Sequence, residues 1–314
     1  MTQVAVIGSI IADMYVRTAR VPAVGENLLA ESLTVGPGGK GANAAVAVAR
    51  AGAEAVLVGC IGDDDFGRME LNRLREEGVN VDAITVDPEV GTGTALVMID
   101  ADGENTILVI IGANDRLSAE AVHQALEVHR GTLDGILVNF EIPEDAVAAV
   151  VRAGRERGVP VVVDAGPPRS YARETWAECT VITPNALETA TLVGHPVHGD
   201  AAAEQAAREL LAAGPEAVVL KRGGDGALLL TAEQELHVPA FPVETVDTTG
   251  AGDAFSAALT IAIAEGLPLE QAVRRASAAG ALACTQFGTM AAMPTRAEVD
   301  AFLAERMAEE TRFF

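Results

Sequence analysis

The sequence predicts an α/β fold in which helices cover both faces of a mostly parallel sheet. Short runs rich in β-branched residues alternate with segments of helical periodicity along most of the 314 residues, as parallel strands joined by helical crossovers do. The chain is 49% hydrophobic but only 4% aromatic, so aliphatic side chains must fill the core. No internal repeat or linker interrupts this pattern, and we interpret residues 1–314 as one domain.

The elements follow in order from the hydrophobic runs and the glycines that close them. The first strand is "VAVIG" (4–8), and a helix at 43–52 ends at Gly52. A second helix, amphipathic and closed by Gly78, is predicted at 66–78. Further strands are predicted at 55–62, 135–140, 160–166, 180–185 and 216–223, and further helices at about 252–265, 268–286 and 295–310.

Two segments do not fit the alternation. Residues 94–111 form two β runs around Asp102 and Gly103, which is a hairpin signal. Residues 27–39 form another β-like segment between glycine-rich turns. Strands outside the alternating pattern predict a small separate sheet that lies as a flap on the main layer.

The composition excludes several classes of function. The formal net charge is −23 with a pI near 4.5, so the chain should repel nucleic acid and anionic membrane surfaces. No apolar run reaches the roughly 18 residues of a membrane span, and no basic segment with a long apolar run opens the chain. The three cysteines are widely spaced and lack metal-ligand spacing, which favours reduced thiols in the cytoplasm.

The segment "DTTGAGDAF" (247–255) is the first candidate for catalysis. Helical spacing begins near Gly250, so Gly250, Ala251 and Gly252 present backbone N–H groups at a helix N-terminus, which is an anion site. Asp253 would repel a phosphate, but beside one it can accept the proton of an attacking hydroxyl. The alternative is an acid that only stabilises the start of the helix, worth about 0.3–1 kcal/mol.

The segment "GPGGKGANAAVAVA" (36–49) is the second candidate. It is not a P-loop, because Lys40 is followed by Gly41 in place of Ser or Thr. Its glycines allow close backbone approach to a ligand, and Lys40 and Asn43 can donate to hydroxyl oxygens. The alternative is a flexible turn with a helix cap. Lys40 and Lys221 are the only lysines of the chain, and both lie in glycine-rich segments.

Other polar residues follow predicted strands at their carboxyl ends, where ligands bind in doubly wound sheets. Asp13 lies in "GSIIADMYV" (8–16), directly after the first strand, although an ordinary loop acid is the alternative. The remaining ones are Glu141, Asn185, Glu188 and the glycine-rich turn 221–228.

In this order, "GGKGANAAVAVARAG" and "DTTGAGDAF" resemble the two signatures of the ribokinase family of carbohydrate kinases, and "GAND" (112–115) and "ITPN" (182–185) add to the likeness. The resemblance runs from Val4 to about Leu303. It implies a three-layer α/β/α fold with a small β lid, formed by about 12–37 and 91–112, which often pairs with the lid of a second copy in a homodimer. The implied reaction is ATP-dependent phosphorylation of a sugar hydroxyl, with D-ribose to D-ribose 5-phosphate as the first candidate and Mg²⁺, with K⁺ as a further candidate, as cofactors.

The resemblance also implies roles for individual residues. Asp253 would be the catalytic base, and the backbone of Gly250, Ala251 and Gly252 the anion hole. The sugar would be held by Asp13, Gly39, Lys40, Asn43, Glu141 and Asp253. The nucleotide would be held by Asn185, Lys221, Gly223, Gly226, Gly252 and Ser277. Glu188 would place Mg²⁺ through water, and a monovalent cation would lie at Asp247 and Thr249 with carbonyls near Ala283, Gln286 and Gly288.

The chain departs from the pattern of its nearest family members at four positions. It has Ile11 where they carry Asn, which removes one amide from the sugar pocket. It has Asp164 in place of Asn and Lys221 in place of Thr, and near Ala292 the hydroxyl expected beside the cation is absent. The alternatives are therefore another substrate (fructose, 2-keto-3-deoxygluconate or a nucleoside) or a silent sugar-binding protein. A nicotinamide-dependent oxidoreductase is excluded, because no G-x-G-x-x-G follows the first strand.

Overall fold

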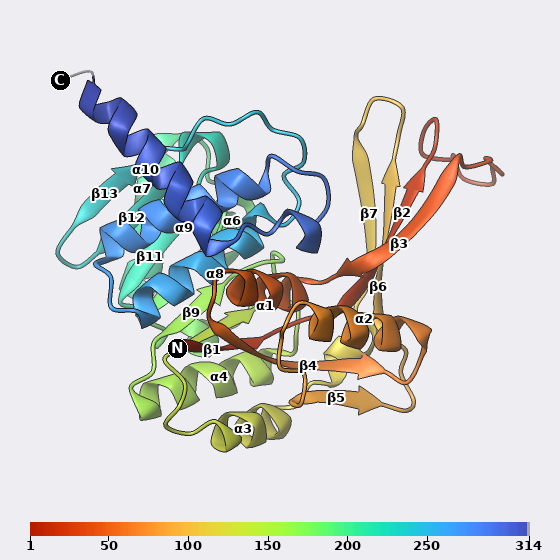
Figure 1. Ribbon diagram of the computed structural model, residues 1–314, viewed down its shortest axis with the longest axis horizontal. Coiled ribbons are helices and arrows are strands. Elements are labelled where there is room, and N and C mark those ends of the chain that lie inside the picture. The colour runs from red at the N-terminus through yellow and green to blue at the C-terminus, as the bar shows by residue number, and fades with distance from the viewer. Residues whose placement is uncertain (313–314) are drawn as a thin grey trace.

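The computed structural model describes residues 1–312 and contains two sheets (Figure 1). The main sheet has nine strands: those from β11 to β5 run parallel, and at one edge β12 pairs antiparallel with both β11 and β13. In spatial order they are β13 (Glu235–Val238), β12 (Ala227–Thr231), β11 (Ala217–Lys221), β10 (Val181–Ile182), β9 (Val161–Asp164), β8 (Gly135–Asn139), β1 (Gln3–Ile7), β4 (Glu54–Gly62) and β5 (Ile84–Asp87).

Helices cover both faces of the main sheet because successive side chains of each strand point to opposite sides. In β1, Val4 and Val6 join a core with α1 (Lys40–Arg50), α8 (Ala251–Ala264) and α9 (Leu269–Ala283). Ala5 and Ile7 join a second core with α3 (Ala119–Val128), α4 (Glu144–Arg157) and α7 (Asp200–Ala213). The predicted α/β/α layers are therefore confirmed.

The other helices are α2 (Asp65–Glu76), α5 (Arg173–Trp176), α6 (Ala186–Val193), α10 (Arg296–Arg312) and the 3₁₀ turns η1 (Gly112–Arg116), η2 (Gly223–Asp225) and η3 (Met290–Ala292).

Two of the predicted boundaries differ from the structure for a clear physical reason. The helix expected from residue 43 begins at Lys40, because Gly39 takes a φ of 91° and caps it. The strand expected at 180–185 keeps only Val181 and Ile182, since Pro184 has no N–H to donate and Asn185 caps α6.

The small sheet stands away from the main layer in Figure 1. Its order is β3 (Ser32–Gly38), β2 (Ile11–Arg17), β6 (Gly93–Ile99) and β7 (Asn105–Ile110). β6 and β7 form the predicted antiparallel hairpin, and Gly103 in its turn has a φ of 83°. Asp13, which we expected in a loop after the first strand, lies instead within β2. The local sequence does not show this, because β2 belongs to a different sheet from β1.

One side chain ties the small sheet to the main one. Asn114 Oδ1 accepts a hydrogen bond from Ile10 N at 2.8 Å, and its Nδ2 donates to Ile10 O at 2.8 Å and to Ile111 O at 2.9 Å. Ile10 directly precedes β2 and Ile111 directly follows β7. Asn114 thus fixes two of the points at which the chain crosses between the two sheets.

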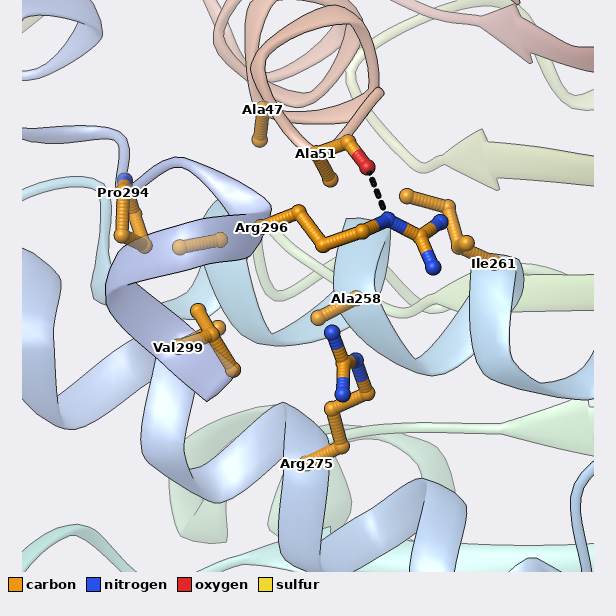
Figure 2. Close-up of a pocket in the computed structure, with 10 residues that line it drawn as sticks. Ala47, Ala51, Ala258, Ile261, Arg275, Pro294, Arg296 and Val299 are labelled. Carbon is orange, nitrogen blue, oxygen red and sulfur yellow. Dashed lines mark hydrogen bonds between the residues drawn. The ribbon is translucent and has the colours of Figure 1, made fainter. Parts of the chain in front are cut away.

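Arg296, the first residue of α10, connects this helix to the ends of α1 and α8 through its guanidinium group (Figure 2). Arg296 Nε donates to Ala51 O at 2.6 Å, and its guanidinium also pairs with Glu265. The cavity beside it measures about 20 Å³, which is room for about one water molecule.

Within residues 1–312, no helix combines the length and apolar character that crossing a bilayer requires.

Candidate active site

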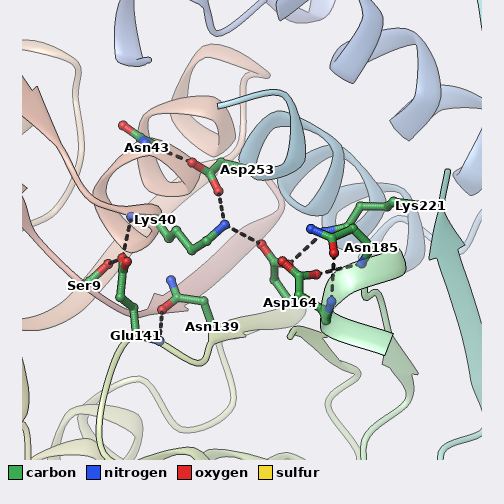
Figure 3. Close-up of polar contacts among 10 residues, drawn as sticks. Ser9, Lys40, Asn43, Asn139, Glu141, Asp164, Asn185, Lys221 and Asp253 are labelled. Atoms are coloured by element: carbon green, nitrogen blue, oxygen red, sulfur yellow. Dashed lines mark hydrogen bonds and ion pairs between the residues drawn. The ribbon is translucent and has the colours of Figure 1, made fainter. Parts of the chain in front are cut away.

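The carboxyl ends of five neighbouring parallel strands bring polar residues to one edge of the main sheet, and Glu141, Asn185 and Lys221 among them are predicted site residues (Figure 3). Glu141 follows β8, Asp164 ends β9, and Asn185 follows β10. Lys221 ends β11, and Ser9 follows β1. The expectation that these strand ends converge is confirmed.

The two glycine-rich motifs meet at Asp253. This carboxylate lies in the first turn of α8 and is 5% exposed. Asn43 Nδ2 donates to its Oδ2 at 2.9 Å, and Lys40 Nζ donates to its Oδ1 at 3.3 Å. Gly250 caps the helix with a φ of 83°, and of the N–H groups predicted for the anion hole, that of Ala251 donates to Thr248 O at 3.3 Å.

Glycine is required where the segment 39–41 packs on the turn after β1. A Cβ on Gly41 would lie 2.5 Å from the carbonyl carbon of Gly8, and one on Gly39 would lie 2.6 Å from Ile11 N. Both contacts are with backbone that cannot move aside. The close approach holds Lys40 between the two motifs.

Four charged side chains form an alternating row across the site. Lys221 Nζ lies 2.8 Å from Asp164 Oδ1, Lys40 Nζ lies 3.7 Å from Asp164 Oδ2, and Lys40 Nζ lies 3.3 Å from Asp253 Oδ1. Both lysines of the chain therefore contact one carboxylate, Asp164, which is 3% exposed.

The row sets the protonation of its members. Burial alone would raise the pKa of Asp164, but Lys221 and Lys40 outweigh it and hold that pKa below its usual value. Burial would lower the pKa of Lys40, yet Asp253 and Asp164 raise it well above its usual value. Burial raises the pKa of Asp253, and the partial compensation comes from Lys40. A buried carboxyl with a raised pKa beside a cation suits a general base.

The residues predicted to hold the sugar lie on the side of the small sheet. Glu141 accepts hydrogen bonds from Ser9 Oγ and, at 3.4 Å, from Lys40 N. Asp13 is 8% exposed, and Tyr15 OH donates to its Oδ2 at 3.2 Å. Burial raises the pKa of Asp13 to about 7, with Glu141 and Asp253 adding to the shift. The buried Oδ1 of Asn43 accepts no hydrogen bond from residues 1–312.

The residues predicted to hold the nucleotide lie on the other side. Asn185 and Glu188 form a capping box at the start of α6, where Asn185 Oδ1 accepts from Glu188 N at 2.9 Å and Glu188 Oε2 accepts from Asn185 N at 2.7 Å. Burial raises the pKa of Glu188 despite the nearby Lys221. Gly223 and Gly226 form the turn between β11 and β12. Ser277 lies on α9, and its buried Oγ has no partner in the described part of the chain.

The residues predicted for a monovalent cation form a separate group. Asp247 Oδ1 accepts from Thr249 N at 2.9 Å and from Thr249 Oγ1 at 2.7 Å, while its Oδ2 accepts from Gly288 N at 3.1 Å. Ala283 ends α9 and Gln286 follows it, so their carbonyls belong to the same segment. The structure brings these loops together, but three donors already occupy the Asp247 carboxylate.

Comparison with known proteins identifies the family. The model described as pfkB family carbohydrate kinase matches residues 1–296. The chain belongs to this family. Ribokinase of Bacillus subtilis (strain 168) is 38% identical over 304 residues, which cover 97% of this chain and 100% of that protein. Deoxyribokinase of Salmonella typhi is 32% identical over 302 residues, covering 96% of this chain and 98% of that protein.

A solved structure agrees with the sequence comparison. The structure of Arabidopsis thaliana ribokinase complexed with ribose and ATP superposes with a TM-score of 0.88 at 31% identity, covering 96% of this chain and 99% of that one. The pfkB kinase described here therefore has the ribokinase fold. It is an ATP-dependent sugar kinase, a phosphotransferase that acts on an alcohol group.

Four polar residues of this pfkB kinase escaped the sequence analysis. Ser9 and Asn139 position Glu141, because Ser9 Oγ donates to its carboxylate and Asn139 Oδ1 accepts from its N–H at 3.1 Å. Asn114, in the quoted "GAND", received no role of its own. Glu70 lies in the amphipathic helix predicted at 66–78 and received no role of its own. The available signal was the spacing of Glu70 from Gly67 and Leu74, because these three residues form the buried face of α2.

We expect Glu70 to make stability fall as pH rises. It is fully buried, and neither carboxyl oxygen has a hydrogen-bond partner within residues 1–312. Burial raises its pKa to about 9, with Asp13 adding to the shift. Between the unfolded value near 4.5 and the folded value, the native state binds more protons than the unfolded one, so the free energy of unfolding must decrease with increasing pH.

Urea unfolding of the wild type and of Glu70→Gln at pH 5, 7 and 9 tests this. Glu70→Gln removes the titration, so its stability relative to wild type should grow with pH, by about 1 kcal/mol or more between pH 5 and 9. Because other groups titrate in both proteins, the difference isolates Glu70. Parallel stability curves for the two proteins would show that Glu70 does not titrate as described.

Proposed function

We propose that this protein transfers the γ-phosphoryl group of ATP to the 5-hydroxyl of D-ribose, giving D-ribose 5-phosphate and ADP. The observation that carries the proposal is the buried Asp253 at the start of α8, contacted by Lys40 and Asn43. Its support comes from the full-length likeness to ribokinase of Bacillus subtilis and to the Arabidopsis structure complexed with ribose and ATP.

In the proposed reaction the sugar hydroxyl oxygen attacks the γ-phosphorus. An oxygen–phosphorus bond forms to the sugar while the bond to the β,γ-bridging oxygen breaks, and ADP leaves with that electron pair. The hydroxyl proton passes to the carboxylate of Asp253. The backbone N–H groups of Gly250, Ala251 and Gly252 stabilise the negative charge of the transferring group.

The sugar would be held through the hydroxyls that are not transferred. Asp13 and Glu141 offer carboxylate oxygens, and the unpartnered Oδ1 of Asn43 offers a further acceptor. Gly39 allows its backbone to approach the sugar closely. The sugar hydroxyls would satisfy polar groups that otherwise remain buried without partners.

The nucleotide would lie over Asn185, Lys221, Gly223, Gly226 and Ser277. Glu188 fits a role beside Mg²⁺, because this ion usually keeps several bound waters and such a water can donate a hydrogen bond to a carboxylate. When bound with ATP, Mg²⁺ would neutralise part of the phosphate charge. Glu188 is oriented for this by its hydrogen bond from Asn185 N.

A monovalent cation such as K⁺ would lie near Asp247 and Thr249. Backbone carbonyls of Ala283, Gln286 and Gly288 supply suitable oxygen ligands, while the carboxylate fixes the loops around them. The missing hydroxyl near Ala292 argues for a weaker dependence on K⁺.

We propose that the small sheet, within 12–37 and 91–112, is the lid of a single kinase domain and pairs with the lid of a second copy. Along β7, Ile107, Leu108, Val109 and Ile110 are exposed by between 47% and 62%. Consecutive apolar residues point to both faces of the sheet, which a monomer would leave in water. A monomer in sedimentation velocity would contradict this pairing.

The free cysteines, of which Cys60 and Cys179 are buried, support a cytoplasmic location.

The proposal is tested by ADP release from Mg·ATP with a panel of acceptors, with and without K⁺. The panel contains D-ribose, 2-deoxy-D-ribose, D-fructose, 2-keto-3-deoxygluconate and several nucleosides. D-ribose should give the highest kcat/KM. Another acceptor in first place would overturn the substrate and implicate Ile11, whereas sugar binding without ADP release would favour the silent binding protein.

A further inference from the structure

Both lysines of the chain lie against a single buried carboxylate. Each oxygen of Asp164 faces one ammonium group, Lys221 at 2.8 Å and Lys40 at 3.7 Å (Figure 3). Every other Lys-or-Arg position of the chain carries arginine. Arginine is a broad planar fork and lysine a compact point charge, so the restriction of lysine to this spot indicates that two small ammonium groups are needed there.

The two lysines differ in what else they contact. Lys40 also donates to Asp253 and therefore lies on the side of the proposed base. Lys221 has no second ion pair in the described part of the chain at salt-bridge distance. Instead its Nζ lies over the start of α8, 3.7 Å from where a Cβ on Gly252 would be. An ammonium group at a helix N-terminus reinforces the attraction of that terminus for an anion.

An aspartate beside the place proposed for the ATP phosphates is unfavourable by itself, because like charges repel. Asp164 is tolerable there only if its charge is compensated, and the two lysines supply that compensation. In return Asp164 restricts two flexible side chains that would otherwise sample many rotamers. The two departures from the family pattern, Asp164 and Lys221, are therefore one ion pair whose members require each other.

We propose that Asp164 is a positioning residue, which holds Lys40 beside Asp253 and sets Lys221 against the terminal phosphates of ATP. This inference rests on the proposed function, since it assigns a contact to the nucleotide of the same site. Lys221 is then the residue that touches ATP and ADP, and Asp164 acts through it.

The first test compares nucleotide affinities by calorimetry, with Mg²⁺ present, for the wild type and Lys221→Met. Loss of a charged contact to the terminal phosphates should weaken binding of ADP and of the non-hydrolysable analogue AMP-PNP by about tenfold or more. AMP lacks those phosphates, so its affinity should stay within about twofold. Equal weakening of all three nucleotides, or no weakening, would overturn the assignment.

The role of Asp164 is tested by a double-mutant cycle with Asp164→Asn, Lys221→Thr and the combined variant. Each single change breaks the ion pair, and in Lys221→Thr the Asp164 carboxylate is left facing Lys40 alone. The ADP affinity of the combined variant should therefore exceed the value obtained by multiplying the two single losses. Additive losses would show that the pair is not a unit. Arg208→Met, which removes one exposed positive charge on α7, is the matched control and should leave ADP affinity unchanged.

A second readout is taken on the wild-type protein, and Lys221→Met serves only to assign its signals. Labelling with [ε-¹³C]lysine gives two NMR signals per chain, because there are two lysines. The signal that Lys221→Met removes should shift on addition of Mg·ADP and not on addition of D-ribose. A Lys221 signal that ignores Mg·ADP contradicts the inference.

Failure of this inference can be told apart from failure of the proposed function. All these measurements report binding of nucleotide, and none requires turnover. If the Lys221 signal responds to Mg·ADP but no acceptor releases ADP, the proposed function fails and the inference stands. If D-ribose is phosphorylated while Lys221→Met leaves the ADP-to-AMP affinity ratio unchanged, the inference fails alone.

Discussion

Replacing Asp253 with asparagine is expected to lower kcat by about 10²–10⁴-fold, the range that general-base catalysis contributes. An amide cannot accept the hydroxyl proton, yet it has nearly the same shape. The new side chain can accept from only one of Asn43 and Lys40, since its NH2 group is a donor, but it fills the same space, so folding and ADP binding should survive. Steady-state ADP release, circular dichroism and calorimetry with ADP measure the three properties.

A matched control separates catalysis from a helix-end effect. Asp65 lies in the first turn of α2 as Asp253 lies in the first turn of α8, but its side chain is 98% exposed. Asp65→Asn removes the same favourable interaction with a helix dipole and should leave kcat unchanged. If Asp253→Asn kept more than a few per cent of wild-type kcat, Asp253 would not be the base.

Replacing Lys40 with methionine should have the second largest effect. It removes the cation that lies between Asp253 and Asp164, so each of these two buried carboxylates loses one ion pair. The loss should cost about 3 kcal/mol of stability. Because Lys40 is the main influence that lowers the pKa of Asp253, that pKa must rise. Asp253 acts as a base only when ionised, so the acid limb of the kcat–pH profile should move to higher pH.

Lys40→Arg is the matched variant, because it keeps the positive charge. Its pH profile should stay close to that of the wild type even if the broader guanidinium lowers kcat. The decisive comparison is the position of the acid limb in the two variants. An unmoved limb in Lys40→Met would mean that Lys40 does not control the ionisation of the base.

Much of this architecture could be predicted from the sequence because local signals agreed with tertiary structure. The buried runs at 4–8 and 135–140 became β1 and β8, and the Asp102–Gly103 turn became the hairpin of the small sheet. The motif containing Lys40 and Asn43 and the one containing Asp253 each predicted a helix start with bare backbone. That they face each other follows from the packing of α1 on α8.

The rest depended on contacts between distant residues. Asp13 was read as part of a loop, since nothing local shows that β2 leaves the main sheet. Asp164 and Lys221 were noted only as separate departures, and their pairing appears only when β9 and β11 lie in one sheet. The burial of Glu70 is not visible in the local sequence, because it is imposed by β2, β3 and β4, which pack on α2.

The most direct test of the central claim is ³¹P NMR of the purified protein with Mg·ATP and D-ribose. The account predicts that a sugar phosphomonoester, D-ribose 5-phosphate, and ADP appear in equal amounts. No inorganic phosphate should form, because we expect the small sheet proposed as the lid to close over the sugar and keep water from the γ-phosphoryl group. Inorganic phosphate released at the same rate with and without D-ribose, or no phosphomonoester at all, would contradict it.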